Sequence, residues 1–405
     1  MIIVDQLSIC IPFFRVLYPK AQILFYGHFP DQLLTKKTAG LTKYVKKVYR
    51  FPFDLLEGWS TSCADVIAVN SKFTKVVYRH TFPGLRANDL KVIYPCVDTL
   101  ESGGEDEKSA VPLWPGKKLL LSINRFEGYK NLPLALKAYA GLSSAERANA
   151  KLVIAGGFDP RSAENASTHA SLQRLAEELK LTHATFRSND TLTTDLTTDD
   201  VDVLFLLSIP NELKNRLLHS ASLLLYTPEN EHFGIVPLEA MLAGVPVLAT
   251  NTGGPLETIY DGRTGWLRSA KDVSAWTEIM GKLFIPSSAS NLTAMGQKGR
   301  ERVLADFSRT KMVASFEREI DALCVRTAKK EPRVRVTPDW VLALAMVTAI
   351  SVVAGTAITF VFIKMINTQE ERYQAALAKG AARRAVEAIT TGVAAVTAAV
   401  GKDEL

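Results

Sequence analysis

The stretch that decides the fold of this chain is 231–267, EHFGIVPLEAMLAGVPVLATNTGGPLETIYDGRTGWL. It begins with an acidic loop residue, Glu231, and Gly234 follows closely. A short helix is expected to open around Pro237, because proline suits a first helical position, where its missing N–H would have had no partner. Glu239 therefore lies about one turn into that helix, eight positions after Glu231.

These residue types suit a nucleotide-sugar donor. A loop carboxylate such as Glu231 accepts hydrogen bonds from sugar hydroxyls, and Gly234 lets the backbone come close to a phosphate. The start of the helix, at Ile235 and Val236, offers free N–H groups and a favourable dipole for the same anion. Glu239 is then placed to accept hydrogen bonds from a ribose diol.

A second corner lies beside the first in the chain. Residues 245–250 predict a buried strand, and Gly253 and Gly254 predict the turn from that strand into the next helix. Taken alone, either motif also fits an ordinary surface helix or turn. The two motifs in this order are more specific, and they predict that Gly253 and Gly254 border the same ligand.

The combined motif resembles E-x7-E of glycosyltransferase family 4, whose members are retaining enzymes with the two-domain GT-B fold. The resemblance implies two Rossmann-like domains and a sugar-positioning role for Glu231. Short apolar runs at 22–26, 65–69 and 118–123 are independently typical of buried parallel strands. The chain is therefore predicted to be α/β and doubly wound.

Residues 1–100 are expected to form the acceptor-side domain. His28 comes just after the run 22–26, where open α/β sheets bind ligands, although a loop histidine is more often structural. The resemblance implies that His28 contacts the donor sugar. It also implies a first strand and a glycine-rich loop before Met1, so this domain is expected to be incomplete. The basic stretch 36–50 fits either a solvated helix face or contact with lipid headgroups or a lipid-linked pyrophosphate.

Residues 101–116 predict a linker, and 117–325 predict the donor domain. Arg125 and Lys130 lie in the first strand-to-helix loop of that domain, where two cations can clamp a diphosphate. Surface cations are the alternative, and the resemblance favours phosphate contacts for both. Gly128 and its neighbour Tyr129 stand where close relatives carry basic residues, which weakens the clamp by charge.

The resemblance implies that no cofactor and no metal are required. The D-x-D sequence at 200–202 has a form that some sugar transferases use for a metal, but GT-B enzymes generally work without one. The four cysteines show no metal-binding spacing and fit a reducing compartment. The net charge of +6 comes without a nucleic-acid-binding motif. Phosphate-bearing substrates and an anionic membrane explain it equally well.

The C-terminal part predicts a membrane anchor. Residues 341–363 carry no charge and are long enough to cross a bilayer, with a buried core helix as the alternative. The basic segment 326–340 before them favours a cytosolic body. The tail 364–405 ends in KDEL, a retrieval signal of the endoplasmic reticulum if the tail is luminal. Residues 385–400 form either an Ala-rich surface helix or a second, weak membrane segment.

Within family 4, the segments SINRFEGYKN, AGGFDP, LYTPENEHFGIVPLEAM and NTGGPLE most resemble mannosyltransferases of the dolichol pathway. That resemblance implies GDP-mannose as donor and a dolichyl-pyrophosphate-linked Man-GlcNAc2 as acceptor, extended by α-1,3 and then α-1,6 mannose. It implies the endoplasmic reticulum membrane as the location and other mannosyltransferases of the pathway as candidate partners. The alternatives are a family 4 enzyme with a different lipid acceptor and a catalytically dead membrane scaffold.

Overall fold

A computed structural model describes residues 1–34, 41–85, 90–98, 113–187, 200–328 and 364 of the chain. The chain divides into one unit of Met1–Thr35 with Glu57–Arg335 and a second of Lys36–Leu56 with Val336–Leu405. The second unit includes the first part of helix α3 (Leu41–Ser62), where Arg50 pairs with Asp54 at 3.1 Å. Both sheets of the described residues lie in the first unit.

Four parallel strands form an N-terminal sheet in the order β1-β2-β3-β4. The strands are β1 (Ile2–Asp5), β2 (Ile23–Gly27), β3 (Val66–Val69) and β4 (Lys91–Val92). The helices between them are η1 (Ser8–Cys10), α1 (Ile11–Leu17), α2 (Asp31–Leu34), α3, α4 (Lys72–Thr81) and η2 (Pro83–Leu85). The apolar runs at 22–26 and 65–69 thus lie in β2 and β3, which are buried along their whole length.

The last described helix of the first unit, α14 (Arg309–Ala328), packs on this N-terminal sheet. The rings of Phe316 and Tyr26 lie 5.4 Å apart between centroids, and Leu323 is buried in the same cluster. A segment from the far end of the first unit therefore completes the core of its first sheet.

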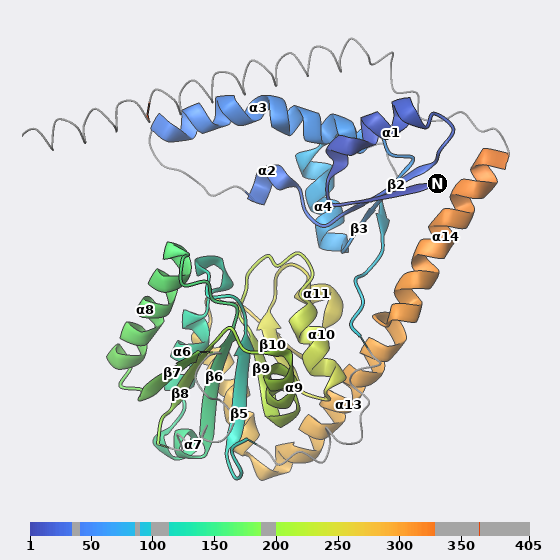
Figure 1. Cartoon of the computed structure of the whole chain (residues 1–405). Coiled ribbons are helices and arrows are strands. Elements are labelled where there is room, and N and C mark those ends of the chain that lie inside the picture. Colours follow the sequence, from blue (N-terminus) through green and yellow to red (C-terminus); the bar gives the residue numbers. More distant parts are fainter. Residues whose placement is uncertain (35–40, 86–89, 99–112, 188–199, 329–363, 365–405) are drawn as a thin grey trace, which may run out of the picture. The chain divides into compact units, whose positions relative to one another are not determined.

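Seven parallel strands form the larger sheet, in the order β11-β10-β9-β5-β6-β8-β7. Figure 1 labels all of these strands except β11. They are β5 (Lys118–Ile123), β6 (Ala150–Gly156), β7 (His183–Arg187), β8 (Val203–Leu207), β9 (Ala221–Tyr226), β10 (Val247–Thr250) and β11 (Gly265–Arg268). We call this sheet and its helices the donor lobe, and the four-stranded sheet and its helices the N-terminal lobe.

The helices of the donor lobe alternate with its strands. They are η4 (Gly128–Lys130), α6 (Pro133–Ala140), α7 (Ser144–Ala148), α8 (Ala163–Glu178), α9 (Asn211–Ser220), α10 (Ile235–Leu242), α11 (Pro255–Thr258), α12 (Val273–Gly281), η5 (Lys282–Phe284), η6 (Pro286–Ser288) and α13 (Ala289–Asp306). The doubly wound arrangement predicted from the sequence is confirmed for this lobe.

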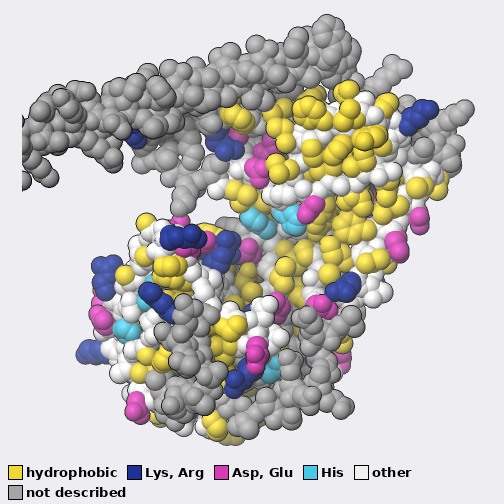
Figure 2. Space-filling view, viewed as in Figure 1, with side chains coloured by type: hydrophobic (Ala, Val, Ile, Leu, Met, Phe, Trp, Pro, Cys, Tyr) yellow, Lys and Arg dark blue, Asp and Glu magenta, His cyan; other side chains and the backbone are white. Residues whose placement is uncertain are grey.

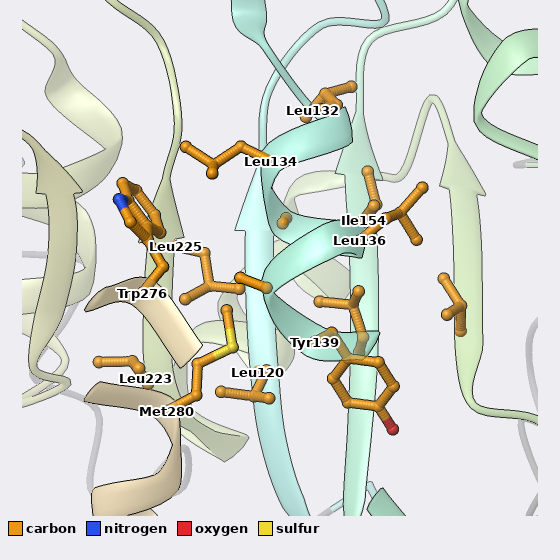
Figure 3. Packing of buried hydrophobic residues seen from close by; sticks show 14 of the residues in the cluster. Leu120, Leu132, Leu134, Leu136, Tyr139, Ile154, Leu223, Leu225, Trp276 and Met280 are labelled. Carbon is orange, nitrogen blue, oxygen red and sulfur yellow. The ribbon is translucent and has the colours of Figure 1, made fainter. Parts of the chain in front are cut away.

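Alternate residues of each strand enter two different cores, because successive strand side chains point to opposite faces. Leu120 and Ile154 pack under α6, α8 and α12, while Leu121 and Val153 pack under α9 and α10. Figure 3 shows the first core, with Trp276 and Met280 from α12 against Leu225 and Leu120 of the sheet. Burial on both faces explains why these strands read as continuous apolar runs.

The order of the strands places a switch point beside β5. This first strand of the lobe lies between β6 and β9, so the chain winds outward on one side and returns on the other. The carboxyl ends of β5 and β9 therefore lie next to each other. Open parallel sheets bind ligands at such a point.

Some boundaries differ from those expected. Helix α10 begins at Ile235, so Pro237 is its third residue and not its first. Proline is tolerated there because none of the first four N–H groups of a helix has an intrahelical partner. Helix α8 begins at Ala163, where the side chain of Ser162 accepts a hydrogen bond from the N–H of Asn165.

Strand β11 was not expected from the sequence. It pairs with β10 along its whole length and so forms one edge of the sheet. Its sequence, Gly-Trp-Leu-Arg followed by Ser269, does not alternate between apolar and polar residues as a half-buried strand does. Pairing with β10, rather than its own pattern, makes it a strand.

The predicted membrane segment falls outside what the structure describes. Residues 329–363 and 365–405, which include the expected span, the tail and the alternative segment 385–400, are not described. Among the described residues, no helix combines the length and apolarity that crossing a bilayer requires. The linker at 101–116 lies largely outside the described residues too. The domain boundaries stay predictions.

Candidate active site

The loop after β5 carries both predicted phosphate ligands, and a glycine of β6 lets it fold closely. A Cβ at Gly156 would lie 2.1 Å from the carbonyl oxygen of Asn124, so only glycine fits where the two strand ends meet. The loop then forms the single turn of η4 and leaves it through Asn131, which adopts a left-handed conformation. Asparagine tolerates that conformation better than most residues.

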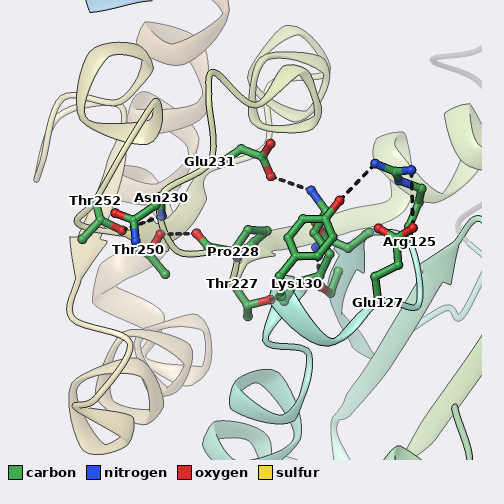
Figure 4. Close-up of polar contacts among 12 residues, drawn as sticks. Arg125, Glu127, Lys130, Thr227, Pro228, Asn230, Glu231, Thr250 and Thr252 are labelled. Atoms are coloured by element: carbon green, nitrogen blue, oxygen red, sulfur yellow. Dashed lines mark hydrogen bonds and ion pairs between the residues drawn. The ribbon is translucent and has the colours of Figure 1, made fainter. Parts of the chain in front are cut away.

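Lys130 and Glu231, which are 101 positions apart, form an ion pair at this switch point. Lys130 Nζ donates to Glu231 Oε2 at 2.6 Å, and the two side chains are 10% and 17% exposed. Figure 4 shows them pointing toward one another from the loops after β5 and β9. The Thr227 hydroxyl donates to the Lys130 carbonyl at 2.7 Å and so ties the two loops together.

This pairing controls the charge of Glu231. Burial by itself would raise the pKa of the carboxyl, but the charge and hydrogen bond of Lys130 bring it below its ordinary value, with smaller contributions from His232 and the Tyr226 hydroxyl. Glu231 is therefore ionised near neutral pH. An ionised carboxylate is an acceptor only, as recognition of sugar hydroxyls requires.

Arg125 lies apart from this pair and is 64% exposed. It donates to the Tyr129 hydroxyl at 3.0 Å and pairs with Glu127 at 3.4 Å. The Tyr129 ring also lies under Lys130, with Nζ 4.6 Å from the centroid. The two cations expected to act together are thus linked through Tyr129. Glu127 was not predicted as a site residue. Its position in the sequence between the two cations could have indicated that it pairs with one of them.

The glycines of the two motifs hold the Glu231 loop. Gly234 has φ +86°, and a Cβ there would lie 3.0 Å from the Tyr226 hydroxyl. Gly254 N–H donates to the Glu231 carbonyl at 2.7 Å, and a Cβ on Gly254 would lie 2.2 Å from the Phe233 carbonyl oxygen. Gly253 has φ +70°, and a Cβ there would lie 2.5 Å from the Glu231 carbonyl oxygen. These positions need glycine because one loop packs directly against the other.

Helix α10 starts immediately after Gly234, with Ile235 and Val236 as its first two residues. Its Glu239 accepts a hydrogen bond from Lys214 of α9 at 2.9 Å, a partner that the sequence did not indicate. Both side chains line a cavity of about 180 Å³ with Asn215. Glu239 therefore faces a space beside α10 that can take part of a ligand.

His28 lies at the end of β2, where the sequence placed it. Its Nε2 lies 2.9 Å from Asp5 Oδ1, and its side chain is 45% exposed. The next residue, Phe29, stacks on His232 with ring centroids 3.5 Å apart and an interplanar angle of 8°. The loop that carries His28 thus reaches the residue next to Glu231. This stack was not predicted.

The D-x-D sequence at 200–202 has a structural role in the described chain. Asp202 accepts hydrogen bonds from the backbone N–H and the hydroxyl of Thr182, at 2.9 Å and 2.8 Å. It therefore holds the start of β7 against that of β8, away from the carboxyl ends of the strands.

Comparison with known proteins gives the class of this chain. The family described as "Glycosyl transferases group 1" matches residues 104–302. Sucrose-phosphate synthase from Thermosynechococcus elongatus has a similar structure, with a TM-score of 0.61, 19% identity and coverage of 80% of this chain and 73% of that one. Anabaena HepE in complex with UDP has a TM-score of 0.60 at 15% identity, over 80% and 78% of the two chains. The fold is thus that of two-domain, GT-B glycosyltransferases.

Closer relatives are found by sequence. The "Alpha-1,3/1,6-mannosyltransferase alg-2" of Neurospora crassa is 45% identical over 87% of this chain and 74% of its own length. The Saccharomyces cerevisiae protein of the same description is 44% identical, over 82% and 67%. The chain belongs to the family of these mannosyltransferases.

Proposed function

We propose that this chain transfers mannose from GDP-mannose to a dolichyl-pyrophosphate-linked Man-GlcNAc2, first in α-1,3 and then in α-1,6 linkage. The chain is a mannosyltransferase of N-glycan precursor assembly, as its family relationship indicates. The observation that carries the assignment of the site is the Lys130–Glu231 pair at the switch point of the larger sheet. It joins one predicted phosphate ligand to one predicted sugar ligand.

The donor diphosphate would be held from two sides. Lys130 supplies a nearly buried positive charge, and Arg125 supplies an exposed guanidinium that can turn from Glu127 toward an incoming anion. The first turn of α10, at Ile235 and Val236, adds N–H groups that have no intrahelical partner and the positive end of the helix dipole. An anion at this position would also share Lys130 with Glu231, so donor binding and the placement of Glu231 are coupled.

The mannose would lie between the two loops that meet at the Phe29–His232 stack. Glu231, ionised and oriented by Lys130, would accept hydrogen bonds from its hydroxyls. His28 would approach from the other side of the sugar, across from Glu231. The nucleoside would extend toward the cavity beside α10, where Glu239, oriented by Lys214, would accept from the ribose diol.

The reaction retains configuration, because GDP-mannose and the product both carry an α bond. A double displacement would need a free carboxylate nucleophile under the anomeric carbon. Glu231 is a poor candidate, since Lys130 holds its charge at 2.6 Å. We therefore propose substitution on one face. The bond from the anomeric carbon to the β-phosphate oxygen breaks and the acceptor oxygen bonds to that carbon. The acceptor proton passes to the leaving phosphate.

Arg125 and Lys130 would stabilise the charge that develops on this phosphate, which is where electrostatic catalysis gains most. No metal or other cofactor is proposed. Transfer that continues in EDTA would support this, and activity lost in EDTA and restored by Mg²⁺ or Mn²⁺ would contradict it.

The decisive experiment uses membranes that contain the full chain, GDP-mannose and a monomannosyl-chitobiosyl pyrophosphate lipid. We expect the lipid product to gain two hexoses, with linkages resolved by linkage-specific mannosidases. Membranes with Glu231→Gln serve as the matched control and should form this product about 10²- to 10³-fold more slowly. Gain of one hexose would limit the activity to one linkage. No gain while GDP-mannose still binds would contradict the acceptor assignment and favour another lipid acceptor or a scaffold role.

We also propose that residues 341–363 anchor the enzyme in the endoplasmic reticulum membrane, with its body in the cytosol and the tail in the lumen. Asn291, exposed on α13 and followed by Leu-Thr, is an acceptor sequence for glycosylation on the described surface. Asn165 is unsuitable, since it is 8% exposed and donates to the Phe126 carbonyl at 3.0 Å.

A glycosidase-sensitive mobility shift should therefore be absent from the wild-type chain. An acceptor sequence introduced at about residue 380 should be glycosylated, and this variant is the positive control. Glycosylation of Asn291 would overturn the orientation. An unmodified acceptor in the tail would favour residues 385–400 as a second membrane segment.

A further inference from the structure

The sequence left one carboxylate of the second glycine motif without a role. Glu257, in α11, accepts backbone hydrogen bonds from a helix of the other lobe: Oε2 from Lys72 N–H at 2.8 Å and Oε1 from Phe73 N–H at 2.7 Å. These are the first two N–H groups of α4, and the third, of Thr74, donates to the N-cap residue Ser71. Glu257 thus caps a helix from which it is 184 and 185 positions away.

The contact is charged and directional. A carboxylate at a helix N-terminus gains from the dipole as well as from two hydrogen bonds. Glu257 Oε2 also accepts from the Tyr94 hydroxyl at 2.9 Å, which fixes the plane of the carboxylate. Both carboxylate oxygens of Glu257 therefore accept hydrogen bonds. Two of the three donors belong to α4, and the third, Tyr94, follows β4 of the same lobe.

Glu257 is itself firmly held in the donor lobe. Arg302 of α13 donates to the carbonyl of Glu257 at 2.7 Å and to that of Thr258 at 2.9 Å. The same guanidinium lies 3.5 Å from the ring centroid of Tyr260. Helix α11 is thus attached to the donor lobe through its backbone, which leaves the side chain of Glu257 to hold α4.

The loop that carries Glu231 lies beside the contact between Glu257 and α4. Ser71, the N-cap of α4, donates through its hydroxyl to the His232 carbonyl at 2.6 Å. On the other side, Gly254 donates to the Glu231 carbonyl at 2.7 Å, three residues before Glu257. The loop is therefore held between α4 and the glycine corner, and Glu257 links these two supports.

We propose that Glu257 is a positioning residue for transfer: it fixes α4, and with it the acceptor-side lobe, against the loop that presents Glu231. The inference rests on the proposed function, since it assigns Glu257 to that reaction. Glu257 would act through α4 and the Glu231 loop without touching either substrate. Its loss would misplace the acceptor relative to the donor, and misplacement by about 1 Å can cost roughly 100-fold in rate.

The test compares Glu257→Ala with Glu146→Ala in the full chain. Glu146 is a matched control, because its carboxylate also caps a helix: it accepts from the backbone N–H and the hydroxyl of Ser143 at 2.8 Å and 2.7 Å, within the donor lobe. Both variants should lose a helix cap. Only Glu257→Ala should lower kcat for mannose transfer, by roughly 10- to 100-fold, with GDP affinity and the KM for GDP-mannose within about twofold of wild type.

A graded series sharpens this test. Glu257→Gln keeps one acceptor oxygen and should retain more turnover than Glu257→Ala. Backbone amide exchange in 72–81 should rise from wild type to Glu257→Gln and rise further in Glu257→Ala. A fall in kcat no larger than that of Glu146→Ala would reduce Glu257 to a stability role and overturn the proposal, as would an equal loss of GDP affinity. If the wild-type chain itself transfers no mannose, the proposed function fails first, and the two failures are thereby distinguished.

Discussion

The two parallel sheets of the first unit are made of similar strands but are covered differently. In the donor lobe, β5, β6, β8 and β9 are buried on both faces by helices. In the N-terminal lobe, β2 and β3 are buried, whereas Ile3 of the edge strand β1 is 51% exposed. Helix α1 adds exposed apolar side chains, including Phe13 at 65% and Val16 at 80%. Figure 2 shows hydrophobic side chains gathered on this part of the molecule.

The difference teaches where each lobe obtains its order. The donor lobe carries a complete core of its own on each face of its sheet. The N-terminal sheet relies more on elements supplied by other parts of the first unit, α14 on one face and the Glu257 carboxylate on α4. Substitutions in its cores should therefore change the stability of the donor lobe. Substitutions at the contacts between the lobes should change how the N-terminal lobe is positioned.

The largest effect is expected at the centre of the site. Glu231→Gln keeps the shape but removes the charge that Lys130 faces at 2.6 Å, so mannose transfer should fall about 10²- to 10³-fold. The matched control is Glu229→Gln, an exposed carboxylate in the same loop, which should transfer normally. Transfer by Glu231→Gln at the wild-type rate, measured from the mass of the lipid product, would refute the assignment of Glu231.

The second test addresses the cores directly. Leu120→Ala in β5 removes a fully buried side chain and should lower the free energy of unfolding by about 3 kcal/mol. Phe13→Ala in α1 removes a larger but mostly exposed ring and should change it by no more than about 0.5 kcal/mol. Thermal and urea unfolding measure the change in the free energy of unfolding for both variants. A larger loss for Phe13→Ala would mean that α1 is covered in the working protein.

Several parts of the candidate site could be predicted from the sequence because each depends on a short, local pattern. Strand ends, glycines at left-handed or crowded positions and the charges beside them all lie within short stretches. The Lys130–Glu231 pair follows once both loops are assigned to adjacent strand ends. The doubly wound fold was predictable for the same reason, since each strand and helix carries its own period.

The contacts between the lobes could not be predicted in this way. The Phe29–His232 stack and the cap of Glu257 on α4 each join residues that no local pattern relates. Which side chain meets a helix N-terminus depends on how two sheets come together, and a capping carboxylate from elsewhere leaves no trace near the helix. The contacts of Arg125 with Glu127 and Tyr129 could not be predicted either, because charge alone does not show which neighbour a guanidinium contacts.

A smaller effect is expected at this guanidinium, and it sharpens the comparison within the donor lobe. Arg125→Ala removes one charged hydrogen-bonding group from the proposed phosphate site, which should weaken GDP binding by about 1.5 kcal/mol, or about tenfold. Arg174→Ala, an exposed arginine of α8, should bind GDP as tightly as wild type. Isothermal titration with GDP measures both. Equal affinities for the two variants would place the diphosphate elsewhere.

The smallest effect concerns the pH dependence of the contact between the lobes. Burial lowers the pKa of His232 below its ordinary value of 6.5, supported by the charges of Lys130 and His28 and opposed by Glu231. A lowered pKa means that the unfolded chain binds a proton more readily than the folded one. The contribution of His232 to stability is therefore fully present above pH 6.5 and is lost as the pH falls through the folded value.

We expect the thermal midpoint of the wild-type chain to fall more steeply below pH 6.5 than that of His232→Phe, which keeps an aromatic ring beside Phe29 but cannot take up a proton. His169→Phe is the matched control in the donor lobe, because burial also lowers the pKa of His169. If the stack orders the contact between the lobes, only His232→Phe should make mannose transfer less sensitive to acid. Identical acid profiles for both variants would show that the titration of His232 affects stability alone and does not reach the contact that brings the two loops together.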